Sequence, residues 1–291
     1  MGAESPKTEI MTAKEKLIAA FLALAFAPAV ISLARIWSSV DYYSHGFLVP
    51  LVAYWIARRD GKTRLRPRDE RAPAGGAVIG FALALYAAGL AAGAAGLQGL
   101  GLIVAVAGGA LYLLGRDGLR ALAFPIAFLV FMLPIPNAWL TPLILDLQLL
   151  VSSSAVAVLH AFGATVAREG NVVLLAGGDS LFVEEACSGI TSIVTLAPLA
   201  VVLAYFTQRT LWRRLALVAA AAPAAMVANL LRVVLTVIMA QRLGAERATN
   251  NALHESAGLL TFVLACLALI GLGALLRGPR ARVARPGSGG P

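Results

Sequence analysis

The residues of this sequence that could do chemistry are two cysteines, three histidines and an arginine within a long apolar stretch. Cys187 stands near Glu184, Glu185 and Ser188, directly before an apolar helix predicted over 190–206. The N–H groups at a helix N-terminus lower the pKa of a thiol there, and they can also hold an oxyanion. Cys187 is therefore a candidate nucleophile. Cys266 lies among apolar residues within a predicted span and is expected to be inert.

Arg232 lies in an apolar stretch predicted to cross a membrane over 215–240. A charge within a span is costly and is therefore a candidate for function. Asn229 comes three residues earlier, which places both side chains on one helix face. The alternative interpretation is an arginine that extends to the outer headgroups.

The histidines differ in their surroundings. His45 and His254 each precede an apolar stretch, and His45 is expected either to contact substrate or to pack between helices. His160 has no partner that the sequence identifies, so it is expected to be structural. Glu184 and Glu185 could shape a site around Cys187, although a surface role is expected for both.

The composition indicates the kind of protein that must position these residues. Of 291 residues, 59% are hydrophobic and only 13% are charged, against roughly 25% charged in a soluble domain. This excludes a disordered chain and a disulfide-rich secreted protein, and it disfavours a soluble enzyme. The sequence predicts an all-α polytopic membrane protein with about eight transmembrane helices, since about 20 apolar residues suffice for one crossing.

The eight predicted spans lie near 17–36, 46–57, 73–92, 95–114, 119–135, 188–206, 215–240 and 254–276. An uncleaved first span is preferred over a signal peptide because its apolar stretch continues to about Ile36. The stretch 138–163 contains several polar residues and is expected to be an interfacial or re-entrant helix. Paired glycines such as Gly75-Gly76, Gly108-Gly109 and those at 271–273 are expected to allow close helix packing.

The basic residues predict the orientation. Segment 58–71 and the tail 277–291 each carry a net charge of +4 within a total of +9. With both in the cytoplasm, 19 of the 24 basic residues fall on that side and four on the other, as the positive-inside rule expects. A basic nucleic-acid-binding protein would not sort its arginines by loop. Both termini are then cytoplasmic, and Cys187, Arg232, His254 and His45 lie at the outer face.

A small extracytoplasmic β-hairpin is predicted within about 164–187, ahead of Cys187. The runs Asn171–Leu175 and Ser180–Glu184 flank Gly177-Gly178-Asp179, a suitable turn. The chain is therefore expected to comprise a cytoplasmic N-terminus (1–16), a membrane-embedded domain (17–276) and a basic cytoplasmic tail (277–291).

Several motifs carry a resemblance to a known family. They are Tyr43–Pro50, Glu169-Gly170-Asn171, Glu185–Ile190, Asn229–Arg232 and His254-Glu255. Their types and order resemble the exosortase/archaeosortase family, from about residue 40 to 260. Its members are multi-span membrane proteins proposed to act as cysteine transpeptidases. Bacterial members process exported proteins whose C-terminus carries a Pro-Glu-Pro motif, a membrane helix and a basic tail (PEP-CTERM), in a system often associated with exopolysaccharide production.

The resemblance implies roles for three residues: Cys187 as nucleophile, His254 as acid/base and Arg232 as the charge-stabilising group. His45, Asn229, Glu184 and Glu185 are candidate supporting or substrate-binding residues. No cofactor, metal or nucleic acid is expected. The expected partners are the lipid bilayer and membrane-anchored proteins that carry the sorting signal, with the acceptor molecule left open. The expected location is a bacterial inner membrane, with the site facing the periplasm.

Other function classes remain as alternatives. A transporter or channel would use Arg232 and Asn229 as ligands, but it would need polar residues in the middle of several spans, which the sequence almost lacks. A non-catalytic component of an exopolysaccharide export or assembly system would tolerate loss of Cys187. A metalloprotease of the H-E-x-x-H type would need a second histidine after His254, which is absent.

Overall fold

A computed structural model describes residues 12–59, 72–176, 178–183, 187–244 and 251–277, without the side chains of Lys14, Leu243 and 251–255. The chain divides into two units, Met1–Leu140 and Thr141–Pro291, with the boundary inside helix α5. The elements of the first are α1 (Ala13–Ser39), η1 (Asp41–Phe47), α2 (Leu48–Arg59), α3 (Pro73–Ala91), α4 (Ala95–Phe128) and η3 (Leu129–Met132). Next come α5 (Asn137–Ala161), β1 (Val166–Glu169), β2 (Val172–Leu175), β3 (Ser180–Phe182), α6 (Ile190–Thr207), α7 (Leu211–Ala219), α8 (Ala221–Leu243) and α10 (Asn251–Leu276).

Seven helical segments among the described residues are long and apolar enough to cross a membrane. They are Glu15–Ser39, Pro73–Ala91, Ala95–Met132, Asn137–Ala161, Ile190–Thr207, Leu211–Arg242 and Ser256–Leu276. Each contains a stretch of the length that the hydrocarbon layer requires. The prediction of an all-α polytopic membrane protein is confirmed.

The number of segments differs from the expected eight for local reasons. Ala95–Met132 joins two predicted spans across a kink at Gly115, whose φ of 72° lies in the left-handed region. Helix α2 has 12 residues, about 18 Å, which is short of the hydrocarbon layer of about 30 Å. Helix α5, expected to be interfacial or re-entrant, is apolar enough to count as a candidate span.

In the first unit, glycines bring α3 and α4 close together. A Cβ at Gly75 would overlap the backbone of Tyr112, and a Cβ at Gly108 would lie 2.9 Å from Cγ1 of Ile79. Such positions let two backbones approach, which is how helices associate tightly in lipid. Packing therefore explains Gly75 and Gly108, whereas Gly76, Gly109 and Gly271 have no described atom within 4 Å of an added Cβ.

One end of the first unit is held by hydrogen bonds to the segment after α4. The indole Nε1 of Trp37 donates to the carbonyl of Met132 over 2.9 Å. The Tyr43 hydroxyl accepts from the backbone N–H of Ile135 over 2.7 Å. These bonds satisfy backbone groups that the irregular chain leaves without helical partners.

The second unit contains an antiparallel sheet in the order β1-β2-β3. Strand β2 pairs with β3 so that Val172 faces Phe182 and Leu174 faces Ser180. Gly178, with φ of 88°, lies in the connection. The predicted hairpin is confirmed, and β1 adds a strand that was not predicted.

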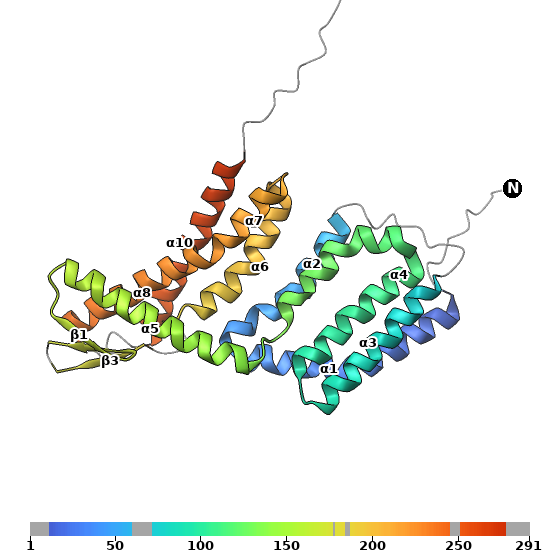
Figure 1. Cartoon of the computed structure of the whole chain (residues 1–291), viewed down its shortest axis with the longest axis horizontal. Helices are drawn as coiled ribbons and strands as arrows, with labels where there is room; N and C mark the ends of the chain where they lie inside the picture. Colours follow the sequence, from blue (N-terminus) through green and yellow to red (C-terminus); the bar gives the residue numbers. More distant parts are fainter. Residues whose placement is uncertain (1–11, 60–71, 177, 184–186, 245–250, 278–291) are drawn as a thin grey trace, which may run out of the picture. The chain divides into compact units, whose positions relative to one another are not determined.

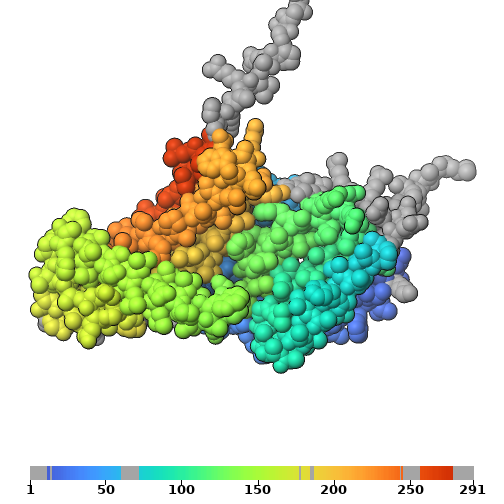
Figure 2. Space-filling model, viewed as in Figure 1, coloured from blue at the N-terminus to red at the C-terminus, as the bar shows by residue number. Residues whose placement is uncertain are grey.

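Helices α6, α8 and α10 contact one another in the second unit and share a core that includes Leu196, Ala225 and Leu269. Figures 1 and 2 show the sheet near one end of these helices and α7 near the other. A second core joins the sheet to α5 and α8. It contains Val151 of α5, Val173 of β2 and Val237 of α8. The start of α6 therefore lies on the sheet's side of this unit.

Candidate active site

The segment before α6 places Cys187 at the entrance of the helix. Gly189 is the N-cap residue with φ of 90°, a left-handed conformation that glycine adopts without strain. The hydroxyl of the buried Ser188 accepts from the backbone N–H of Ile190 over 3.2 Å. Cys187 thus lies three residues before the first residue of α6, where the sequence predicted it.

The Cys187 side chain is only 8% exposed. It belongs to the core in which α5, the sheet and α8 meet, together with Val183 and Val233. Neither Cys187 nor Cys266 is part of a disulfide. The two thiols differ in their position, because Cys187 precedes a helix and Cys266 lies inside α10.

Asn229 fixes the backbone of Cys187. Its Nδ2 donates to the Cys187 carbonyl over 2.6 Å, and its side chain is 2% exposed. Asn229 also lies beside Gly189, since an added Cβ there would be in ordinary contact with its Nδ2 at 3.4 Å. A buried carbonyl needs a donor, and α8 supplies it to the candidate nucleophile.

Arg232 lies one helical turn after Asn229 on α8 and faces α10. An added Cβ at Gly258 would lie 3.1 Å from Cζ of Arg232 and 3.2 Å from its second terminal nitrogen. Gly258 therefore leaves room for the guanidinium against the backbone of α10. Position 254 is four residues earlier in the same helix, hence on the same face one turn away.

Three predicted site residues have side chains outside the described part of the chain. Glu184 and Glu185 precede Cys187 in the sequence. His254 belongs by its backbone to the first turn of α10, and its side chain is not described. The structure thus brings together Cys187 and Asn229, and it sets Arg232 against the turn that follows His254.

His45 belongs to the first unit, in η1. Its Nε2 lies 3.1 Å from the carbonyl of Phe131. Burial lowers the pKa of His45, while the hydrogen bond to the backbone carbonyl of Phe131 opposes that shift. A neutral ring that hydrogen-bonds another segment of its own unit favours the packing interpretation over substrate contact.

A family model of transmembrane exosortases (Exosortase_EpsH) matches residues 37–271 of the 291. The chain belongs to the transmembrane exosortase family. The matched region contains Cys187, Asn229, Arg232 and position 254. No curated protein and no solved structure matches the chain.

Membership of the exosortase family supports a membrane transpeptidase role in general. It also agrees with the helical membrane fold described above. The chemistry of individual residues depends on the geometry around Cys187.

In this exosortase, the polar residues of α5 hold the sheet, a role that sequence reasoning missed. Nε2 of Gln148 donates to the carbonyl of Val183 over 3.0 Å. The Ser152 hydroxyl donates to the Gly170 carbonyl over 3.3 Å. Nε2 of His160 lies 2.7 Å from the carbonyl of Val166, which supplies the partner that the sequence did not identify. The regular spacing of these residues along α5 was the available signal, because side chains one or two turns apart lie near one face.

Proposed function

We propose that this exosortase cleaves the C-terminal sorting signal of exported proteins through a Cys187 thioester. The signal consists of a Pro-Glu-Pro motif, a membrane helix and a basic tail. The enzyme acts at the outer face of a bacterial inner membrane. The observation that carries the proposal is the hydrogen bond of 2.6 Å from Asn229 to the Cys187 carbonyl, made by the helix that also carries Arg232.

The chemical steps follow from the types of these residues. His254 takes the proton of the Cys187 thiol, and the resulting thiolate attacks the carbonyl carbon of the scissile peptide bond to form a tetrahedral oxyanion. The guanidinium of Arg232 donates hydrogen bonds to that oxyanion, since it remains charged and carries parallel donors. The C–N bond then breaks, and protonated His254 gives its proton to the leaving amine.

The resulting thioester has two possible acceptors. Attack by an amine gives a new amide bond and restores the thiol, whereas attack by water gives a carboxylic acid. Mass spectrometry of the new C-terminus of a processed reporter identifies which product forms.

The distribution of charge supports the proposed orientation. Segment 58–71 and the tail carry most of the net positive charge, which favours the cytoplasm for both. The predicted topology counts α2 and not α5 among its eight spans, and with that set of spans α5 lies along the membrane face. In the view of Figure 1, the part of α5 in the second unit runs across the direction of α6 and α10. Its exposed residues Leu145, Leu149 and Leu150 suit contact with lipid.

The decisive experiment replaces the candidate nucleophile. A reporter with the C-terminal sorting signal is expressed with the wild-type enzyme, with Cys187→Ala and with Cys266→Ala. We expect Cys187→Ala to abolish processing and Cys266→Ala to leave it unchanged. Normal processing by Cys187→Ala would refute a cysteine mechanism and favour a non-catalytic role in an exopolysaccharide system.

A further inference from the structure

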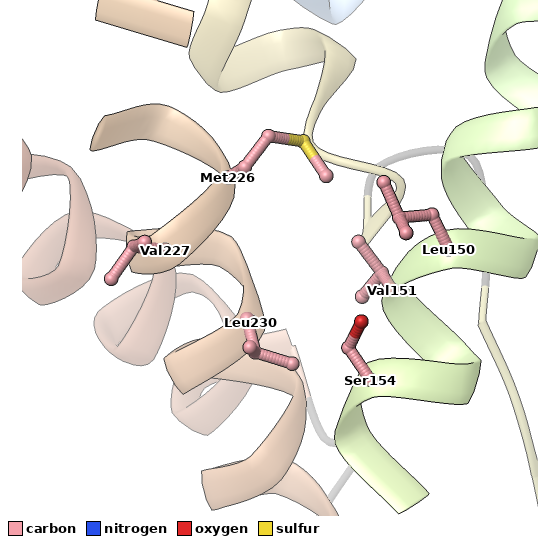
Figure 3. Close-up of a pocket in the computed structure, with 6 residues that line it drawn as sticks. All are labelled: Leu150, Val151, Ser154, Met226, Val227 and Leu230. Carbon is pink, nitrogen blue, oxygen red and sulfur yellow. The ribbon is translucent and has the colours of Figure 1, made fainter. Parts of the chain in front are cut away.

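An apolar pocket of about 150 Å³ lies between α5 and α8 in the second unit. Figure 3 shows Met226 and Leu230 of α8 directed toward the side chains of α5, with Val227 pointing to the other side. They are Leu150, Val151, Ser154, Met226, Val227 and Leu230. Ser154 contributes the one hydroxyl among these six side chains, so the pocket suits a hydrocarbon group.

The pocket adjoins the segment that carries Cys187. An added Cβ at Gly189 would lie 3.2 Å from Sδ of Met226, and Met226 and Leu230 pack against the core that includes Cys187. Asn229 lies on the same helix and binds the Cys187 carbonyl. In Figure 3, the chain that leads into α6 passes beside the pocket. Whatever fills the pocket therefore lies beside the short segment that carries the candidate nucleophile into α6.

The surroundings of the pocket decide the chemistry of its occupant. Leu150 is 54% exposed and Val227 is 68% exposed, so the pocket opens toward the outside of the unit. Helix α8 belongs to a candidate membrane span, and the exposed Leu150 of α5 suits contact with lipid. A group that enters the pocket from hydrocarbon must be uncharged. An apolar space of about 150 Å³ is large enough for a group the size of benzene. One aliphatic or aromatic side chain fits that description.

We propose that this pocket receives one aliphatic or aromatic side chain from the membrane-embedded part of the substrate. The proposal rests on the proposed function, because a substrate cleaved at Cys187 must place its membrane helix beside that residue. The pocket then fixes the position of the scissile bond relative to the sulfur. One seated side chain sets how far the substrate helix extends toward the bilayer surface.

Photo-crosslinking tests which molecule occupies the pocket. A benzoylphenylalanine at position 227 is introduced into the Cys187→Ala enzyme, which binds substrate without cleaving it. We expect a covalent product with the membrane helix of the reporter. The same group at position 264, an exposed residue of α10 outside the pocket, should give little or no such product. Crosslinks to lipid alone from position 227, while the wild-type enzyme retains processing that depends on Cys187, would overturn the pocket assignment and leave the proposed function intact.

Changing the size of the pocket and of the reporter side chain tests whether the pocket selects the substrate side chain. Ser154→Leu fills the pocket, and Ser153→Leu is the matched control, since Ser153 bonds the Leu150 carbonyl within α5 and does not line the pocket. A set of reporters carries alanine, leucine or phenylalanine at one position at a time, over the first two turns of the reporter's membrane helix. A methylene in an apolar pocket changes discrimination about tenfold or more. We therefore expect Ser154→Leu to slow reporters with a large side chain at one position by about that factor, and alanine there to restore them. An equal loss for all reporters, or no loss for any, would refute the assignment.

Discussion

The hydrogen bond from Asn229 to the Cys187 carbonyl predicts a measurable effect on the rate of processing. Asn229→Leu keeps the approximate volume and removes the donor. Because Asn229 is 2% exposed, water cannot reach the carbonyl in its place. A buried acceptor without a donor costs about 1–3 kcal/mol. In Asn229→Leu that cost falls on the backbone conformation in which Cys187 reacts. The population of this conformation, and with it the rate of processing, then falls by about 5–150-fold.

The rate of processing per folded molecule separates a positioning role of Asn229 from its contribution to the stability of the fold. Gln208→Leu is the matched control in the same unit, since Gln208 is 3% exposed and its Nε2 donates to the Gly273 carbonyl over 2.8 Å. Both variants should lower the melting temperature in detergent by similar amounts. Only Asn229→Leu should slow reporter processing per folded molecule in a pulse–chase assay. Equal processing rates for the two variants would refute a positioning role for Asn229.

Two further predictions concern a glycine and a histidine. Gly258→Leu should displace the Arg232 guanidinium from its position on α10 and reduce processing about 100-fold, the usual effect of a misplacement of about 1 Å. Gly271→Leu in the same helix should leave the reporter assay unchanged, so equal losses would contradict this role of Gly258. Because burial lowers the pKa of His45, the unfolded chain binds a proton at His45 more readily than the folded chain does. The free energy of unfolding therefore keeps this contribution above about pH 6.5, the unfolded pKa, and loses it as the pH falls through the folded pKa. Melting temperatures in detergent should therefore drop in mild acid, and His45→Gln should flatten that dependence; a variant as sensitive to acid as the wild type would exclude His45 as the cause.

Local patterns were sufficient for the helices and the hairpin. Apolar length predicted most of the spans, and Gly178 between two β-prone runs predicted the pairing of β2 with β3. Strand β1 was missed because only Val166 of its four residues is buried. A strand with a single inward residue shows no alternation in the sequence.

Helix α5 shows where local reasoning was insufficient. Its polar residues suggested an interfacial or re-entrant segment, yet Gln148 and Ser152 donate to carbonyls in and beside the sheet that follows. The sequence contains both partners, but only the fold shows that they meet. A polar residue on an apolar helix has the same local pattern whether it faces headgroups or a carbonyl 35 residues away.

The sequence by itself determined the membrane class, the hairpin and the place of Cys187 before a helix, because these depend on neighbours along the chain. The tertiary structure alone decided that Asn229 holds the carbonyl of a residue 42 positions earlier. It also decided that Gly258 makes room for Arg232. These contacts join separate helices, and their geometry depends on how α6, α8 and α10 pack, which no local pattern encodes.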